Sequence, residues 1–275
     1  MTSLEHDERP GGLASWPRAV TGFVRKTLVI AELEARKLRH DPTELVTRAV
    51  QPALWLLVFG QVVGRTRVFP TGDLRYQDFM TPGILAQSVL FISIFYGISV
   101  LWERDLGITH KFLVTPTPRT ALVLGKALSA GMRALTQAIV VYLLALSVGV
   151  KMNWNPLALL GVLLTIVLTA AIFSTFSLVI AVLVKTRERF MGIGQVLTMP
   201  LFFASNAIYP ISIMPTWLQV VSRVNPLSYV VDALRTLMLQ GGPTVFGLWM
   251  DYSVLVVWAV VLVALGGRLY GNVVR

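Results

Sequence analysis

The sequence has no cysteine, few charged residues, and 24 basic against 14 acidic side chains. The absence of cysteine excludes disulfides and thiolate metal sites, although it does not identify the compartment. Charged residues make up 14% of the chain, where a soluble domain usually carries about a quarter. Hydrophobic residues make up 55%, and the mean hydropathy is +0.69. This balance indicates long buried segments rather than a soluble surface.

The apolar residues are gathered in blocks, and each block is long enough to cross a bilayer. A helix needs about 20 residues to span ~30 Å of hydrocarbon, with some allowance for tilt. The pattern therefore predicts an all-α integral membrane protein with six transmembrane helices, the fifth interrupted by Pro200. The expected spans cover residues 45–63, 83–101, 121–150, 156–184, 193–208 and 252–269.

Two further segments precede the first expected span. Residues 1–17 are polar and lack the apolar stretch of a signal peptide, so we expect a disordered cytoplasmic tail. Residues 18–41 combine an apolar stripe with basic side chains, which favours an amphipathic interfacial helix; a helix packed on another subunit is the alternative. Asp41 and Pro42 then form a helix start, and residues 42–275 form one transmembrane domain.

The basic residues are distributed unevenly between the expected loops. When the N-terminus is placed in the cytoplasm, most Lys and Arg fall in inner segments, including the dense turn at residues 185–189. This positive-inside pattern places both termini in the cytoplasm of a multi-pass protein, which we expect in a bacterial plasma (inner) membrane. It also accounts for the net charge of +10 without nucleic acid as a partner.

The sequence carries no motif for an energy source of its own. A P-loop requires G-x-x-x-x-G-K-[ST], but around Gly125-Lys126 two of the required positions hold Thr120 and Ala127. An ion-coupled carrier usually has carboxylates or histidine within its spans, whereas here we expect no buried carboxylate in them. No Ser/His/Asp set or metal cluster converges at membrane depth, so we expect no catalytic site, no metal and no cofactor in this chain.

The inner segment between the second and third spans is a candidate docking element for a separate motor. It is charged at its start, apolar further on, and closed by prolines, as in a short helix that inserts into a groove on another protein. The alternative is a loop that rests on lipid head groups. The candidate contact residues are Trp102, Glu103, Arg104, Asp105, Leu106, Gly107, His110, Lys111, Phe112, Leu113, Thr115 and Pro116.

The outer segment between the fifth and sixth spans is long, partly apolar and rich in proline. Residues 209–250 are therefore expected to contain short re-entrant helices, because irregular backbone at membrane depth needs cover from protein or a water-filled cavity.

Three motifs, in this order along the chain, resemble those of the ABC-2 type permeases, the membrane subunits of ATP-binding-cassette exporters. The first runs from Met80 to Leu85 at the expected opening of the second span, and the second is the inner segment from Trp102 to Pro116. The third is an outer signature between the fifth and sixth spans. Its residues are Asn225, Pro226, Leu227, Tyr229, Asp232 and Arg235.

The resemblance is nearest to the daunorubicin-resistance type of drug permease, and it implies the partners. The chain would form a homodimer, or a heterodimer with a related permease, surrounded by membrane lipid. Two copies of a separate ATPase, which holds the ATP and Mg²⁺, would dock on a cytoplasmic coupling helix in residues 102–118 and on the 18–40 helix. The complex would export a hydrophobic or amphipathic substrate (a drug, a lipid or a lipid-linked glycan) and support multidrug or antibiotic resistance by efflux.

The resemblance also suggests a substrate path along the first, second and fifth spans, although polar residues there are more often packing groups. Two other functions stay open, namely an ion-coupled efflux carrier and a scaffold or membrane enzyme that transports nothing. The path candidates are Gln51, Gln87, Ser88, Phe91, Tyr96, Phe202, Phe203, Ser205 and Asn206.

Overall fold

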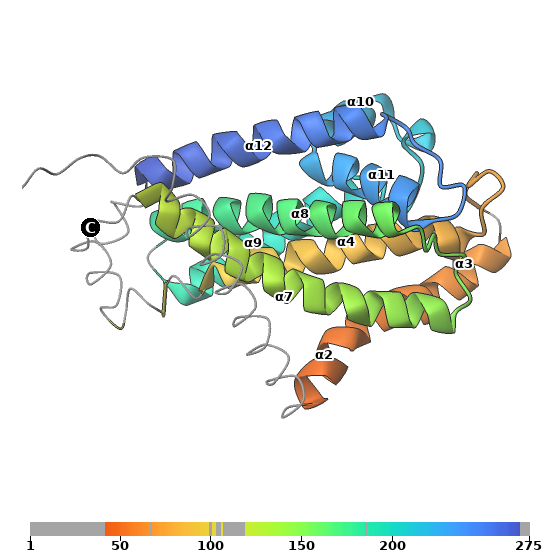
Figure 1. Ribbon diagram of the computed structural model, residues 1–275, viewed down its shortest axis with the longest axis horizontal. Coiled ribbons are helices and arrows are strands. Elements are labelled where there is room, and N and C mark those ends of the chain that lie inside the picture. The colour runs from red at the N-terminus through yellow and green to blue at the C-terminus, as the bar shows by residue number, and fades with distance from the viewer. Residues whose placement is uncertain are drawn as a thin grey trace, which may run out of the picture.

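The computed structural model describes residues 42–66, 68–98, 101–102, 106, 119–184 and 186–269. Within these ranges the regular secondary structure is helical, apart from one isolated β-bridge between Met152 and Leu239, and loops join the helices. The long helices lie side by side along the length of the molecule (Figure 1). The expected tail and interfacial helix, residues 1–41, lie outside the described residues.

Four of the described helices are long and apolar enough to cross a membrane. They are α4 (Tyr76–Tyr96), α7 (Arg119–Ser147, apolar from Gly125), α8 (Pro156–Leu183) and α12 (Leu248–Leu269). They match the expected second, third, fourth and sixth spans, and the chain is therefore an integral membrane protein. We call the end of the bundle that holds the start of α4 the outer end, following the charge pattern; it lies at the right in Figure 1.

The second span begins earlier than expected, because its polar first turn resembles a loop in the sequence. Arg75 forms two hydrogen bonds with Asp78, at 3.0 and 2.8 Å, and so stabilises the helix start. The motif from Met80 to Leu85 consequently lies inside α4 rather than at its opening.

The first expected span is helical but divided into α2 (Pro42–Ala53), a π-helix (Leu54–Phe59) and α3 (Gly60–Thr66). Pro52 has no backbone N–H, so it cannot bond to the carbonyl of Arg48 one turn earlier. The side chain of Gln137 in α7 donates to that carbonyl at 3.2 Å and replaces the lost bond. Proline and the π turn that follows it are known causes of helix kinks.

The fifth expected span is α9 (Arg187–Phe203), which has 17 residues and is capped by Thr186. The chain after it is not a simple loop. It contains a 3₁₀ turn (Ile211–Ile213), α10 (Thr216–Val224) and α11 (Pro226–Met238), which are the short helices expected before the last span.

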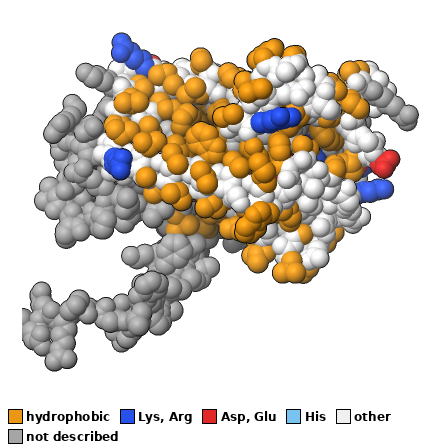
Figure 2. Space-filling view, turned by 90° about the horizontal axis from the view of Figure 1, so that it is seen from above, with side chains coloured by type: hydrophobic (Ala, Val, Ile, Leu, Met, Phe, Trp, Pro, Cys, Tyr) orange, Lys and Arg blue, Asp and Glu red, His pale blue; other side chains and the backbone are white. Residues whose placement is uncertain are grey.

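Burial separates central from peripheral helices. In α4, 78% of the apolar window is buried inside the protein, against 17% in α12. Hydrophobic side chains cover much of the face on the α12 side, as expected for a surface that meets lipid (Figure 2). The helix α4 is therefore the one that other elements pack around.

Candidate functional site

The outer signature begins with Asn225, which caps α11 and joins it to α9. Its Oδ1 accepts the backbone N–H of Leu227 at 3.0 Å, and Pro226 occupies the first helical position. Its Nδ2 donates to the carbonyl of Leu201, in the last turn of α9, at 2.7 Å. One side chain thus starts one helix and holds the end of another.

Tyr229 connects α11 to the elements on either side of it. Its hydroxyl donates to the carbonyl of Arg223 at the end of α10, at 2.6 Å. Its ring packs on Phe246 with the centroids 4.6 Å apart. Leu227, another signature residue, is fully buried in the main core.

Asp232 organises the loop that leads into α12. The carboxylate is fully buried and accepts from Thr244 Oγ1 at 3.0 Å, from the Val245 N–H at 2.9 Å and from the Phe246 N–H at 2.9 Å. Hydrogen bonds to an ionised acceptor are stronger than neutral ones, so this loop is firmly fixed.

Arg235 connects three segments through backbone carbonyls. Its guanidinium donates to the Asn206 carbonyl at 2.7 Å and to the Phe79 carbonyl at 3.3 and 3.4 Å. It also lies 3.9 Å from the centroid of the Phe79 ring. Burial lowers the pKa of Arg235 to about 10, an effect that nearby Asp232 opposes, so the side chain stays protonated at neutral pH. We call Asn225, Asp232 and Arg235 the outer latch.

The segment after α9, residues 204–209, passes against α4 as buried non-helical backbone. A Cβ atom at Gly83 would lie 2.7 Å from the Cα of Ala207, so only glycine permits this approach. The Tyr76 hydroxyl donates to the Ile208 carbonyl at 3.0 Å. Side chains from α4 and α11 therefore satisfy backbone groups that the segment cannot satisfy itself.

At the inner end, the start of the expected coupling segment is attached to the start of α9. The guanidinium of Arg187 lies 3.5 Å from the centroid of the Trp102 ring. The N–H of Leu106, which is exposed, donates to the carbonyl of Trp102 at 3.0 Å. The other candidates lie outside the described residues, namely Glu103, Arg104, Asp105, Gly107, His110, Lys111, Phe112, Leu113, Thr115 and Pro116.

A small apolar core lies next to this contact, and we call it the inner cluster. It joins Leu101 to the last turns of α8 and to Phe190 in the first turn of α9. Leu101, which follows α4, therefore packs as one group with the end of α8 and the start of α9. Its members are Leu101, Leu178, Ile180, Ala181, Val184 and Phe190.

Between its two attached ends, α9 contacts the bundle along a narrow stripe. The buried residues Phe190, Gly194, Thr198 and Phe202 recur every fourth position and so share one face. The other side exposes apolar residues. These are Met191, Ile193, Val196 and Phe203.

The structure divides the expected substrate-path residues by their burial. Gln51 and Phe203 are exposed, and Phe91 and Tyr96 are half-buried. The remaining five are buried inside this chain, namely Gln87, Ser88, Phe202, Ser205 and Asn206. Phe202 packs on Phe203 and on Trp55 of the first expected span, and Ser205 donates to the Phe202 carbonyl, as packing groups do.

The expectation that the spans contain no buried carboxylate was wrong. Asp78 and Asp251 are buried in the first turns of α4 and α12, where the positive end of the helix dipole favours a negative charge. Asp78 is paired with Arg75, and it raises the pKa of that guanidinium. The carboxylate oxygens of Asp251 have no hydrogen-bond partner among the described residues.

These buried acids lie at helix ends rather than in the middle of a span. The arginine that precedes Asp78 by three residues marks its pairing in the sequence, whereas nothing local marks the burial of Asp251. Within the part of the chain that the structure describes, no group of His, Asp and Glu has the arrangement of a metal site.

Comparison with known proteins agrees with this arrangement. The family model for the ABC-2 type transporter matches residues 25–239. The daunorubicin resistance ABC transporter permease protein DrrB1 of Streptomyces coeruleorubidus is 26% identical over 237 residues, which cover 86% of this chain and 80% of that protein. The inner membrane transport permease YadH of Escherichia coli K12 is 25% identical over 197 residues, which cover 70% of this chain and 73% of that protein.

Proteins of this family are membrane transport subunits without an ATPase site, and the ATPase is a separate subunit. The chain therefore belongs to the ABC-2 type transporter family and is the membrane permease of an ABC transporter.

Proposed function

We propose that this permease exports a hydrophobic or amphipathic substrate across a bacterial plasma membrane. Two copies of the ATPase subunit dock on the cytoplasmic face of a permease dimer, where the coupling segment begins. Six helices cross the membrane in each subunit, with the kinked α2–α3 segment and α9 as the first and fifth, and both termini are cytoplasmic.

The observation that carries this proposal is the attachment of α9 at its two ends. The coupling segment begins at Trp102, whose ring stacks with the guanidinium of Arg187 in the first turn of α9. A displacement of that segment by the ATPase therefore pulls directly on the first turn of α9. Because α9 contacts the bundle through one narrow stripe, it can tilt without disrupting the main core.

Exposed apolar faces on the first and fifth spans support the proposal that the permease forms a dimer. The kinked span exposes Leu54, Leu57 and Val58, beside the path candidate Gln51. Two such faces, with those of α9, give the amphipathic lining that a hydrophobic substrate needs. The name of DrrB1 as a daunorubicin resistance permease supports a drug-like substrate.

A second candidate function is ion-coupled efflux, and buried Asp78 and Asp251 are the observation that favours it. Buried carboxylates inside membrane segments often mark proton or ion pathways. The location of both acids in the first turns of helices argues against a pathway that crosses the bilayer.

The test is transport by the permease and its ATPase in inside-out vesicles that receive daunorubicin. We expect uptake that requires ATP hydrolysis and persists when an uncoupler removes the proton gradient. Trp102→Ala should lower uptake several-fold while the ATPase still co-purifies, because the contact of the coupling segment with α9 is lost.

The matched control is Trp154→Ala, which removes another half-exposed tryptophan from the opposite end of the bundle. It should leave uptake unchanged. Uptake that continues without ATP and stops with the uncoupler would replace this proposal with the ion-coupled carrier.

A further inference from the structure

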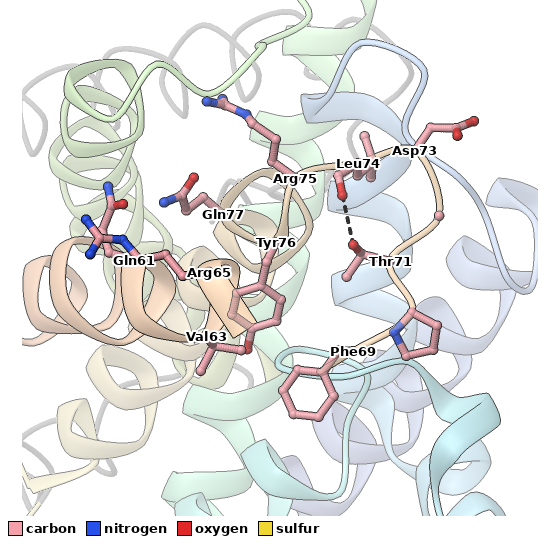
Figure 3. A pocket seen from close by; sticks show the side chains of 13 residues that line it. Gln61, Val63, Arg65, Phe69, Thr71, Asp73, Leu74, Arg75, Tyr76 and Gln77 are labelled. Atoms are coloured by element: carbon pink, nitrogen blue, oxygen red, sulfur yellow. Dashed lines mark hydrogen bonds between the residues drawn. The ribbon is translucent and has the colours of Figure 1, made fainter. Parts of the chain in front are cut away.

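The outer end of the molecule contains a polar pocket that the transport mechanism does not use. It has a volume of about 600 Å³ and lies between the end of α3, the loop that follows, and the first turn of α4 (Figure 3). Because α4 enters the membrane here, the pocket opens at the level of the lipid head groups.

One side of the pocket presents three hydrogen-bond donors. Gln61 and Arg65 are four residues apart on α3 and so share a face, and Gln77 approaches them from α4 (Figure 3). Among the described residues, none of these three side chains has a hydrogen bond or an ion pair. Gln61 and Arg65 are exposed and Gln77 is half-buried, so all three donors are open to a ligand that accepts hydrogen bonds.

Arg75 forms a second, fixed cationic edge. Its guanidinium is held by Asp78 and by the carbonyl of Gly149, and Asp78 raises its pKa, so it stays charged. It also faces an adjoining hollow of about 300 Å³ with Lys151. The one acid on the rim that is not paired, Asp73, points away from the Gln61–Arg65 side in Figure 3.

The lining between these edges is apolar. Val63, Phe69 and Tyr76 supply it, and the rings of Phe69 and Tyr76 lie 5.6 Å apart. The Tyr76 hydroxyl is already used by the Ile208 carbonyl, so the ring presents only its apolar faces. The pocket thus joins an apolar floor to a rim of donors that includes the guanidinium groups of Arg65 and Arg75.

We propose that this pocket binds the phosphate of an anionic phospholipid in the outer leaflet. Guanidinium groups match phosphate oxygens with paired donors, and the amides of Gln61 and Gln77 add neutral donors beside them. The apolar floor accommodates the start of the acyl region. The site does not depend on the direction of transport or on the ATPase, and its assignment to the outer leaflet rests on the proposed topology.

Lipid binding to the purified permease–ATPase complex in zwitterionic detergent tests this site. Native mass spectrometry would compare phosphatidylglycerol with phosphatidylcholine of the same acyl chains. We expect phosphatidylglycerol to bind more tightly than phosphatidylcholine. In the Arg65→Ala variant its affinity should fall about tenfold, which is the effect expected for the loss of one charge-assisted hydrogen bond. Phosphatidylcholine has the same phosphate but also a choline cation, so its binding should be weaker and should fall less in Arg65→Ala.

Arg223→Ala is the matched control, because Arg223 is another exposed arginine at the outer end but lies outside this pocket. Equal losses for Arg65→Ala and Arg223→Ala, or equal affinities for the two lipids, would overturn the proposal. The last measurement adds millimolar inorganic phosphate as a competitor of the lipid. If it displaces phosphatidylglycerol one for one, the ligand is the free anion and the lipid assignment is wrong.

Discussion

The two ends of α9 are attached to the rest of the protein by different kinds of interaction. At the outer end, the latch residues hold it through directional hydrogen bonds between buried groups. At the inner end, an exposed stacking contact and an apolar cluster hold it, and neither requires a single geometry. Hydrogen bonds fix a position, whereas apolar packing permits sliding at low cost. The outer end of α9 is therefore suited to act as a pivot, and its inner end is suited to be displaced by the ATPase.

The largest expected effect comes from breaking the outer latch at its buried carboxylate. Asp232→Ala leaves the N–H groups of Val245 and Phe246 unpaired and removes the charge that faces Arg235. Loss of one partner from such a buried arrangement typically costs 3–5 kcal/mol, so we expect a fall of roughly 10 °C in the thermal midpoint.

Thermal unfolding in detergent measures this change. Asp73→Ala removes an exposed acid from the same end of the molecule and should shift the midpoint by less than about 2 °C. A small effect of Asp232→Ala would mean that the loop before α12 is held by its apolar contacts.

The next effect tests the close approach of residues 204–209 to α4. Gly83→Ala places a methyl group against the backbone of Ala207, which cannot move without breaking the Arg235 bond to Asn206. We expect a loss of about 1–3 kcal/mol, as for other overpacked sites. Gly125→Ala in α7 meets nothing within 4 Å and should be neutral or stabilising. Equal unfolding midpoints for the two variants would contradict the close approach.

A smaller effect separates the two roles of Asn225. Asn155 caps α8 with the same geometry, with Oδ1 3.0 Å from the Leu157 N–H and proline at the first helical position. Among the described residues, its side chain bonds to no second helix. Both alanine substitutions lose a cap worth about 1 kcal/mol. Asn225→Ala should lose about 1 kcal/mol more, since it also loses the bond to Leu201. Urea titration of both variants measures the difference, and no difference would remove Asn225 from the latch.

The smallest effect on stability is expected at the inner end. Arg187→Gln removes a stacking contact at a partly exposed site, which is worth about 0.5–1 kcal/mol. Its effect on ATP-driven transport should nevertheless exceed that of Asn225→Ala, because it separates the coupling segment from α9. A ratio of transport to ATP hydrolysis that stays at the wild-type value would show that the Arg187 contact does not transmit movement of the coupling segment to α9.

The long spans could be predicted from the sequence because burial in lipid requires about twenty apolar residues in succession, whatever the tertiary fold. The first span was predicted as helical, but the bond that replaces the one lost at Pro52 comes from Gln137, which is 89 residues away from Arg48. The local sequence around Arg48 does not show that a hydrogen-bond donor from so distant a residue lies beside its carbonyl.

The candidate site shows the same limit. The roles of Asn225 and Pro226 as a helix start follow from local chemistry. The use of Arg235 depends on the path of residues 204–209 past α4, which no local pattern encodes. Likewise, Ser205 and Asn206, which stay predictions for a substrate path, are buried within this chain, and no local pattern shows that burial. Burial of polar groups is decided by tertiary packing, so a list of polar residues in a span mixes ligands with packing groups.

The hydrogen bonds of Arg235 have a consequence for how this protein can change over evolution. The guanidinium binds main-chain oxygens of residues 79 and 206, and the side chain of Asn206 takes no part in that contact. Main-chain oxygens are the same in every sequence, so residue 206 can vary while the contact survives. Arg235 and Gly83 have no such freedom, because one supplies the donors and the other leaves the space. Divergent relatives can therefore keep this corner of the fold with few identical residues around it.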